Sequence, residues 1–262
     1  MLECSSYKDI NIGMGICGED DYETKVYVYA IDGLMIDTGA QIMEQDVIEF
    51  FKSNHIDQVV LTHNHEDHTG TAPWILKNTN VPVYLNEGAI PSANRPPVMD
   101  GYVTKMWGIR DTFDPKPLTD KIVTSSGKYT FEVIHAPGHK PQHDCFYERS
   151  QGWLFSGDLY LGTKQFVCYK DENMKQTIES IEKVLQLDFD TIFCAHAGVV
   201  ENGKVRLEKR LKFLKDLQNQ VNEMRSQGMD DRAIDAEIYP FNLTIQDISG
   251  GDWSSYNIIH TL

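Results

Sequence analysis

Histidine and aspartate side chains crowd into residues 62–68 of this chain, which have the sequence THNHEDH and follow an apolar, β-branched run typical of a buried strand. Alternate residues at a strand end point to one side, so His63 and His65 could share one cation. Asp67 and His68, beyond the turn, could then reach a second cation. Imidazole and carboxylate without thiolate suit zinc in a catalytic site that keeps one position open for water. The stretch therefore predicts a hydrolytic site with two metal ions about 3.5–4 Å apart.

Three further motifs follow strand-like runs in order along the chain: APGH at 136–139, FSGD at 155–158 and FCAH at 193–196. Together with 62–68, they resemble the motifs of the metallo-β-lactamase superfamily over roughly residues 24–200. The resemblance implies one ligand set of seven residues: His63, His65 and His139 for the first ion, Asp67, His68 and His196 for the second, and Asp158 as the bridge between them.

The resemblance also implies an enzyme that uses two divalent ions, most simply zinc, with iron or manganese as alternatives. Metal ions lower the pKa of bound water from 15.7 toward about 7, so a metal-bridging hydroxide would attack an ester, thioester or lactone. Asp67 would be the catalytic residue that orients the hydroxide and shuttles a proton. Tyr160 is a candidate hydrogen-bond donor to the substrate, with a packed aromatic side chain as the alternative.

Details of the motifs indicate which branches of the superfamily this chain resembles. His68 stands where the best-known zinc β-lactamases carry Arg, and a bridging carboxylate at Asp158 is similar to the glyoxalase II, lactonase and phosphodiesterase branches. Quorum-quenching lactonases carry a catalytic Tyr where this chain has Leu161. We therefore expect a glyoxalase II-like hydrolase. The alternatives are a phosphodiesterase of the same fold, with basic residues of 204–215 as phosphate contacts, and an iron-dependent oxidoreductase similar to persulfide dioxygenases.

His135 and His143 flank His139 closely in the sequence. Ordinary packing or hydrogen bonding is the favoured interpretation for both residues. The alternative is that they do not bind the metal themselves but orient a metal ligand through a hydrogen bond.

The elements that must position these motifs alternate along the chain. A hairpin is predicted from the runs 25–31 and 34–37, joined by Asp32-Gly33. A helix follows, with Ile42, Val47, Phe50 and Phe51 as its candidate buried positions. Further strands are expected at 58–62, 81–85, 129–135, 143–148, 153–156 and 190–195, and a helix at about 173–187. Strands interleaved with helices favour an α/β (α+β) fold, and the resemblance implies a four-layer αββα sandwich with added C-terminal helices.

Residues 87–118 contain many Pro and Gly residues as well as aromatic ones, and predict a long irregular insertion. We expect it to form a lid or a wall of the substrate pocket, with Trp107 as a candidate substrate contact. The competing interpretation is a satellite core or a dimer contact.

The chain beyond residue 200 is predicted to be helical, as an extension (201–262) packed on a catalytic domain of residues 1–200. An apolar stripe recurs at helical spacing from Leu207 to Met224 and indicates core contact, with a homodimer interface as the alternative. The same stretch, 204–225, is rich in Lys and Arg, which favours a solvated helix face. Residues 254–262 are expected to form a tail.

Composition excludes several classes of function. The net charge is −15, with 39 acidic against 24 basic residues, so nucleic acid is not an expected partner and a small-molecule substrate is. No apolar run approaches the roughly 20 residues that span a bilayer. The N-terminus lacks the pattern of a secretory signal, and five widely spaced cysteines predict no disulfide framework, so we expect a cytoplasmic protein.

Overall fold

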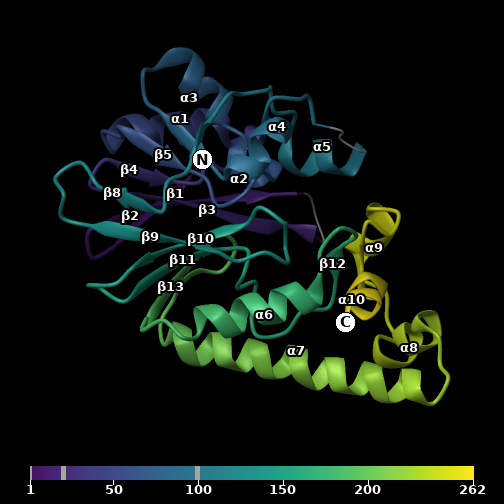
Figure 1. The fold of residues 1–262 in the computed structure, drawn as a ribbon. Coiled ribbons are helices and arrows are strands. Elements are labelled where there is room, and N and C mark those ends of the chain that lie inside the picture. The colour runs from purple at the N-terminus through teal and green to yellow at the C-terminus, as the bar shows by residue number, and fades with distance from the viewer. Residues whose placement is uncertain (1, 19–21, 98–100) are drawn as a thin grey trace.

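The computed structural model describes residues 2–18, 22–97 and 101–262. Two β-sheets lie face to face in the middle of the molecule, and helices cover the outer face of each (Figure 1). The predicted four-layer αββα sandwich is confirmed.

The first sheet has seven strands in sequence order, and its first four are antiparallel neighbours while β4 to β7 run parallel. Its strands are β1 (Glu3–Tyr7), β2 (Ile10–Cys17), β3 (Thr24–Ile31), β4 (Leu34–Ile36), β5 (Gln58–Val60), β6 (Val83–Leu85) and β7 (Lys116–Pro117). The expected hairpin is β3 and β4, and both residues of its Asp32-Gly33 turn have positive φ, as the tight turn between paired strands requires.

The second sheet has six strands in the order β14-β13-β11-β10-β9-β8. They are β8 (Lys121–Val123), β9 (Thr130–His135), β10 (Asp144–Glu148), β11 (Trp153–Gly157), β13 (Thr191–Cys194) and β14 (Gly198–Val200). The parallel pair β11 and β13 lies inside this sheet, so the carboxyl ends of these two strands meet at the same edge.

Alternating side chains on the strands divide the core into three layers. On β11, Trp153 and Phe155 face the first sheet, whereas Leu154 between them faces the helices. On β3, Val28 packs toward the helices of the first sheet and Tyr29 packs between the sheets. This period of two, with both faces buried, is what a four-layer sandwich requires of its strands.

Helices α1 (Glu44–Ser53) and α3 (Ala72–Asn78) cover the first sheet, and α6 (Met174–Val184) and α7 (Gly203–Ser226) cover the second (Figure 1). The remaining helical turns are η2 (Gln41–Met43), α2 (Glu66–Thr69), η3 (Glu87–Ala89), α4 (Ile90–Ala93), α5 (Gly101–Trp107), α8 (Asp231–Ile238), α9 (Thr244–Ile248) and α10 (Ser255–Thr261). A small separate sheet pairs β12 (Cys168–Tyr169) with β15 (Trp253–Ser254).

Three local expectations were wrong. Ile42 is 48% exposed, because it lies in the η2 turn before α1 and so outside the phase of that helix, whose Val47, Phe50 and Phe51 are buried. The insertion is less irregular than expected: it contains η3, α4, α5 and β7, and Pro91 falls in the first turn of α4, where proline is tolerated. Residues 255–261 form α10 rather than a tail, because Ile258 and Ile259 pack into the core.

The stripe on α7 packs into the core cluster on the outer face of the second sheet. Leu207, Leu214 and Val221 are fully buried there, together with residues of α6 and α10. Leu211 is only partly buried against the same cluster. Among the described residues, no helix combines the length and apolar character that crossing a membrane requires.

Candidate metal centre

The motif at 62–68 lies where β5 of the first sheet runs into α2. His63 and His65 occupy the extended chain after β5, and α2 begins at Glu66, so that Asp67 and His68 belong to its first turn. His63 and His68 are fully buried and Asp67 is 6% exposed. The change from strand to helix turns successive side chains toward one point, as the spacing of the motif predicts.

The second sheet contributes the other three residues. His139 lies in the loop between β9 and β10, Asp158 follows β11, and His196 follows β13. Gly138 and Gly157 precede two of these residues and have φ of +136° and +47°. A Cβ atom at Gly138 would lie 2.5 Å from the Thr177 backbone nitrogen, so only glycine lets the chain pass close to α6 and present His139.

Four side chains form a first group of possible metal ligands. His65 Nδ1 lies 2.9 Å from His63 Nε2 and 2.9 Å from His139 Nε2, and His139 Nε2 lies 3.2 Å from Asp158 Oδ2. One ligand atom from each of His63, His65, His139 and Asp158 falls within 4.8 Å of the others.

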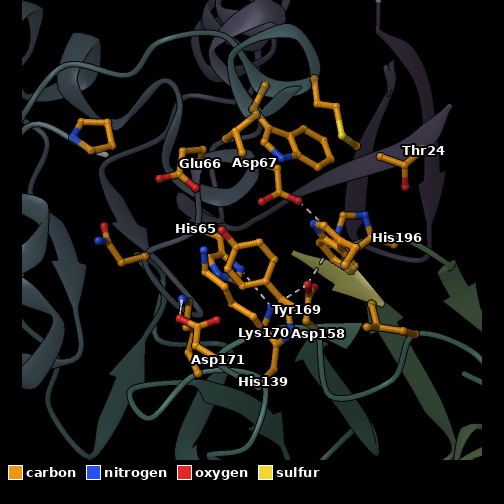
Figure 2. A pocket seen from close by; sticks show the side chains of 18 of the residues that line it. Thr24, His65, Glu66, Asp67, His139, Asp158, Tyr169, Lys170, Asp171 and His196 are labelled. Carbon is orange, nitrogen blue, oxygen red and sulfur yellow. Dashed lines mark hydrogen bonds and ion pairs between the residues drawn. The ribbon is translucent and has the colours of Figure 1, made fainter. Parts of the chain in front are cut away.

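Asp67, His68 and His196 form a second group within the same limit of 4.8 Å. Asp67 Oδ2 lies 3.2 Å from His196 Nε2 and 3.7 Å from His68 Nε2. Asp158 reaches this group as well, since its Oδ1 lies 3.4 Å from His68 Nε2 and its Oδ2 3.4 Å from His196 Nε2. Figure 2 shows the Asp158 carboxylate between His139 and His196.

The outward nitrogens of three histidines face polar groups, two of them through hydrogen bonds and that of His139 through an ion-pair contact. His68 Nδ1 donates to Asp37 Oδ2 at 2.9 Å, and His196 Nδ1 donates to the Lys25 carbonyl oxygen at 2.8 Å. His139 Nδ1 lies 3.2 Å from Glu172 Oε2. Each ring is thereby held with its other nitrogen, Nε2, facing the centre.

Electrostatics at the centre separate the histidines into two kinds. Burial holds the pKa of His63 and of His65 well below the usual range, so both rings are neutral and able to bind a metal. Burial also opposes protonation of His196, but the Asp158 and Asp67 carboxylates outweigh it and raise its pKa well above the usual range. Burial disfavours the charged form of Asp158, yet His196, His68 and His139 together hold its pKa well below the usual range.

Unsatisfied polar atoms test whether these residues fit a divalent ion. His68 Nε2 and Asp158 Oδ1 are buried and, among the described residues, have no hydrogen-bond partner. The nitrogens of His63 and His139 also converge on His65 Nδ1, each at 2.9 Å. Imidazole nitrogens and a carboxylate oxygen directed at a common point are the donor set that divalent transition metals prefer, so the residues fit such ions.

The two flanking histidines differ in their roles. His143 Nδ1 donates to the Ala136 carbonyl oxygen at 3.1 Å, and its Nε2 accepts from the Asp158 backbone nitrogen at 3.1 Å. Burial lowers the pKa of His143 to about 3, in keeping with that neutral tautomer. His143 therefore positions the backbone of Asp158. His135 is half exposed and contacts Asp144 at 3.0 Å.

A cavity of about 1170 Å³ opens onto the centre and is lined by His65, Asp67, His139, Asp158 and His196. Trp107 and Met106 of α5 form part of its wall, so the insertion borders the cavity. Trp107 also packs into the core cluster over the first sheet, so both interpretations of the insertion describe part of its position.

Tyr160 lies elsewhere. It lines a separate hollow with Tyr7 and Arg206, and it is not among the residues around the larger cavity, whereas Leu161 is. Tyr169 does line the larger cavity, and its ring centroid is 6.0 Å from that of His65 (Figure 2).

Sequence reasoning missed the residues that support the ligands. Asp37 follows β4 directly, and the strand-end argument that singled out His63 could have found it, because β4 and β5 are parallel neighbours. Glu172 has no signal in the sequence, since it reaches His139 from a loop 33 residues further along the chain.

This fold and this cluster together define a class of αββα proteins with a histidine-rich centre at one edge of the sandwich. A model of the metallo-beta-lactamase superfamily matches residues 22–196, and the chain belongs to that superfamily. The resemblance inferred from the motifs is confirmed.

Curated relatives are about a quarter identical to this chain over the segments that align. A hydroxyacylglutathione hydrolase of Bdellovibrio bacteriovorus is 28% identical over 182 residues, which are 67% of this chain and 61% of the relative. An atrochrysone carboxyl ACP thioesterase of Claviceps purpurea is 26% identical over 220 residues, 79% of this chain and 63% of the relative. The chain thus spans less than two thirds of the length of either relative.

A solved structure supports the fold over nearly the whole chain. A beta-lactamase domain protein from Burkholderia ambifaria superposes with a TM-score of 0.71 over 98% of this chain and 86% of its own, at 17% identity.

Proposed function

We propose that this protein is a metal-dependent hydrolase of an ester or thioester that works with two divalent ions, most simply zinc. His63, His65 and His139 would hold the first ion, and Asp67, His68 and His196 would hold the second. The observation that carries the proposal is the position of Asp158. Its carboxylate oxygens lie 3.2 Å from a histidine nitrogen of the first group and 3.4 Å from two of the second, as a bridging ligand requires.

Two ions held there would supply Lewis acidity and a water of lowered pKa. Proton transfer and the positioning of the ligands depend on the side chains of this protein. Asp67 is buried and contacts His196 at 3.2 Å on the side that faces the cavity, so its carboxylate is placed to take and release a proton during attack. The candidate ligands are held in one geometry by contacts with Asp37, Glu172 and His143. The entropy cost of ordering the ligands is therefore not incurred during the reaction.

The relatives and the apolar wall of the cavity favour thioesters or esters as substrates. One relative is named a hydroxyacylglutathione hydrolase and the other a thioesterase. The wall contributed by Val103, Met106 and Trp107 is apolar, as in most small-molecule sites. We also propose that residues 1–200 form the catalytic domain and 201–262 an extension on it, because α7 and α10 share one core cluster with the second sheet.

The phosphodiesterase alternative draws no support from the basic helix. None of the described residues that line the cavity belongs to 204–225. An iron oxidoreductase would use a similar ligand set, and the metal content decides between it and the hydrolase.

Elemental analysis and a substrate panel test the proposal. Protein purified without added metal should hold about two ions per chain at full occupancy. A panel of thioesters, lactones and phosphodiesters should show the highest turnover with thioesters. A single iron at full occupancy, with no hydrolysis of any member of the panel, would contradict the hydrolase and favour the oxidoreductase.

Asp158→Asn provides the second arm of the test. It preserves the size of the side chain and removes the charge between the two groups. We expect the metal content to fall toward one ion and hydrolysis to fall by orders of magnitude. Asp216→Asn, an exposed position on α7, is the matched control. Two retained ions with normal turnover in Asp158→Asn would contradict the bridging role.

A further inference from the structure

The cavity wall contains a buried cation that the proposed hydrolysis does not use. Arg110 follows α5, lines the cavity and is 2% exposed. Its Nη1 donates to the Asp111 carbonyl oxygen at 3.1 Å, while its buried Nε has no hydrogen-bond partner in the described part of the chain. A guanidinium carries five N–H donors, so most of its hydrogen-bonding capacity is available to another molecule.

The charge of Arg110 is also poorly compensated. Within the described ranges, no carboxylate lies at ion-pair distance from it. Burial lowers the pKa of Arg110, and Glu66 offsets this only in part through a longer-range interaction. Leaving a buried charge without a partner costs free energy, so an arrangement of this kind favours an anion that enters from the cavity.

Neighbouring groups hold the guanidinium in place beside an apolar surface. It lies over the Phe113 ring, 4.9 Å from the centroid. Val103, Met106 and Trp107 of α5 line the same cavity. Glu66 comes directly before Asp67 in the chain, which places Arg110 on the side of the cavity near the second ligand group. The surface therefore offers a fixed cation next to apolar contacts.

The rim of the cavity carries further positive charge. Arg95 and Lys164 are exposed there and have no ion pair among the described residues, whereas Lys140 is paired with Asp171. Arg95 and Lys164 are therefore local positive sites on the rim that an anion can contact on its way to Arg110.

We propose that Arg110 binds an oxyanion of the substrate, a carboxylate or a phosphate carried on an apolar chain, at a distance from the bond that is cleaved. The planar fork of a guanidinium matches both oxyanions. This inference rests on the proposed function for the identity of the substrate as an ester or thioester. The oxyanion site itself can be tested by binding alone.

Calorimetry of the metal-loaded protein with octanoate, octyl phosphate and 1-octanol tests the site. We expect the oxyanions to bind the wild type more tightly than the alcohol. Arg110→Gln should weaken oxyanion binding by about ten- to a hundredfold and leave binding of the alcohol unchanged. Octanoate and octyl phosphate, compared with each other, identify which oxyanion the site prefers. Oxyanion affinities equal to those of the wild type would overturn the proposal.

Two variants control for charge and for folding. Arg149→Gln removes an exposed cation outside the cavity, one that is paired with Glu132, and should leave the affinities unchanged. Arg110→Lys retains the charge and loses the fork, so an intermediate loss is expected. If Arg110→Gln does not fold, the oxyanion affinities of Arg110→Lys test the proposal instead. Affinities equal to those of the wild type in Arg110→Lys would overturn recognition of the oxyanion by the guanidinium.

Kinetics separate this inference from the proposed function. The substrates are two thioesters that differ only in a terminal carboxylate or its methyl ester. Arg110→Gln should raise KM for the acid alone and abolish the preference for it. If wild-type protein hydrolyses both thioesters and the variant retains the preference, the inference fails and the proposed function stands. If neither these thioesters nor the corresponding oxygen esters are hydrolysed, the proposed function fails and the calorimetry still decides the oxyanion site.

Discussion

At the scale of single residues, the centre depends on side chains behind the ligands as much as on the ligands. Asp37 contacts the Nδ1 atom of His68 and also accepts from the Thr62 backbone nitrogen at 2.8 Å, so one carboxylate orients a ligand and fixes the start of the motif. Glu172 does the same for His139, because its Oε1 accepts from the Tyr169 backbone nitrogen at 2.8 Å while its Oε2 faces the ring. Such outer partners tune metal affinity as well as geometry.

Glu172→Gln tests that role. The substitution retains the size of the side chain but removes the charge beside His139. We expect metal affinity to fall by about 10–100-fold, measured by competition with a chelator, with little change in the melting temperature. Glu179→Gln on the exposed side of α6 is the matched control. Unchanged metal affinity in Glu172→Gln would show that the contact is incidental.

At the scale of elements, α5 and α7 each combine packing with a second property. Helix α5 belongs to the insertion, and its buried side chains both fill the core over the first sheet and border the cavity. Helix α7 buries one stripe against the second sheet and exposes most of its basic residues to solvent, whereas Arg210 is buried and donates to the Gly162 carbonyl oxygen and to Gln165 Oε1. The two helices therefore lie on opposite outer faces of the sandwich (Figure 1).

Trp107→Ala should reveal both properties of α5. Removal of this 8% exposed ring is expected to destabilise the protein by about 3–5 kcal/mol and to raise KM, because the cavity loses part of its wall. Phe51→Ala removes a buried ring from the same core cluster outside the cavity, so it should lower stability without changing KM. Chemical denaturation and steady-state kinetics measure the two effects. Equal KM values in both variants would exclude a role of Trp107 in the cavity wall.

Leu214→Ala tests whether the stripe on α7 belongs to the core. Leu214 is fully buried in the single chain, so we expect the free energy of unfolding to fall by about 2–5 kcal/mol. Val205→Ala, at a position of the same helix that is 49% exposed, should change it by no more than about 0.5 kcal/mol. A small effect at Leu214 that depends on protein concentration would instead indicate a dimer interface.

At the scale of the whole molecule, the centre forms only where the two sheets meet. The first sheet supplies the motif at 62–68 and the second supplies His139, Asp158 and His196. The C-terminal extension reaches back to the same edge, where β15 pairs with β12 and Trp253 lines the cavity. Asp252 links the parts, because it accepts from the Tyr102 hydroxyl at 3.2 Å and contacts Lys170 Nζ at 2.6 Å.

Asp252→Ala removes this link between α5, β12 and the extension. We expect faster amide hydrogen exchange in residues 243–254 and an altered KM, with a small change in global stability, because the core clusters are untouched. Asp216→Ala on the surface of α7 is the control. Unchanged exchange in the variant would show that β12–β15 pairing alone holds the extension.

The sequence by itself determined the alternation of strands and helices and the identity of the seven candidate ligands. Both are encoded locally. A buried strand needs an apolar run, as at β5, and a ligand set needs His and Asp residues at strand ends, as at His63 and His65. The residues at 62–68 are close in sequence, so their type and spacing predict a metal centre there, and the resemblance to the superfamily adds His139, Asp158 and His196.

Only the tertiary structure decided which residues surround that centre. Tyr160 is the tyrosine that the sequence singles out, yet the chain turns after Asp158 so that Tyr160 lines another hollow and Tyr169 lines the cavity. Glu172 reaches His139, and Arg110 enters the cavity wall, through contacts between segments far apart along the chain. Such contacts follow from the packing of both sheets with their helices, and no local pattern encodes that packing.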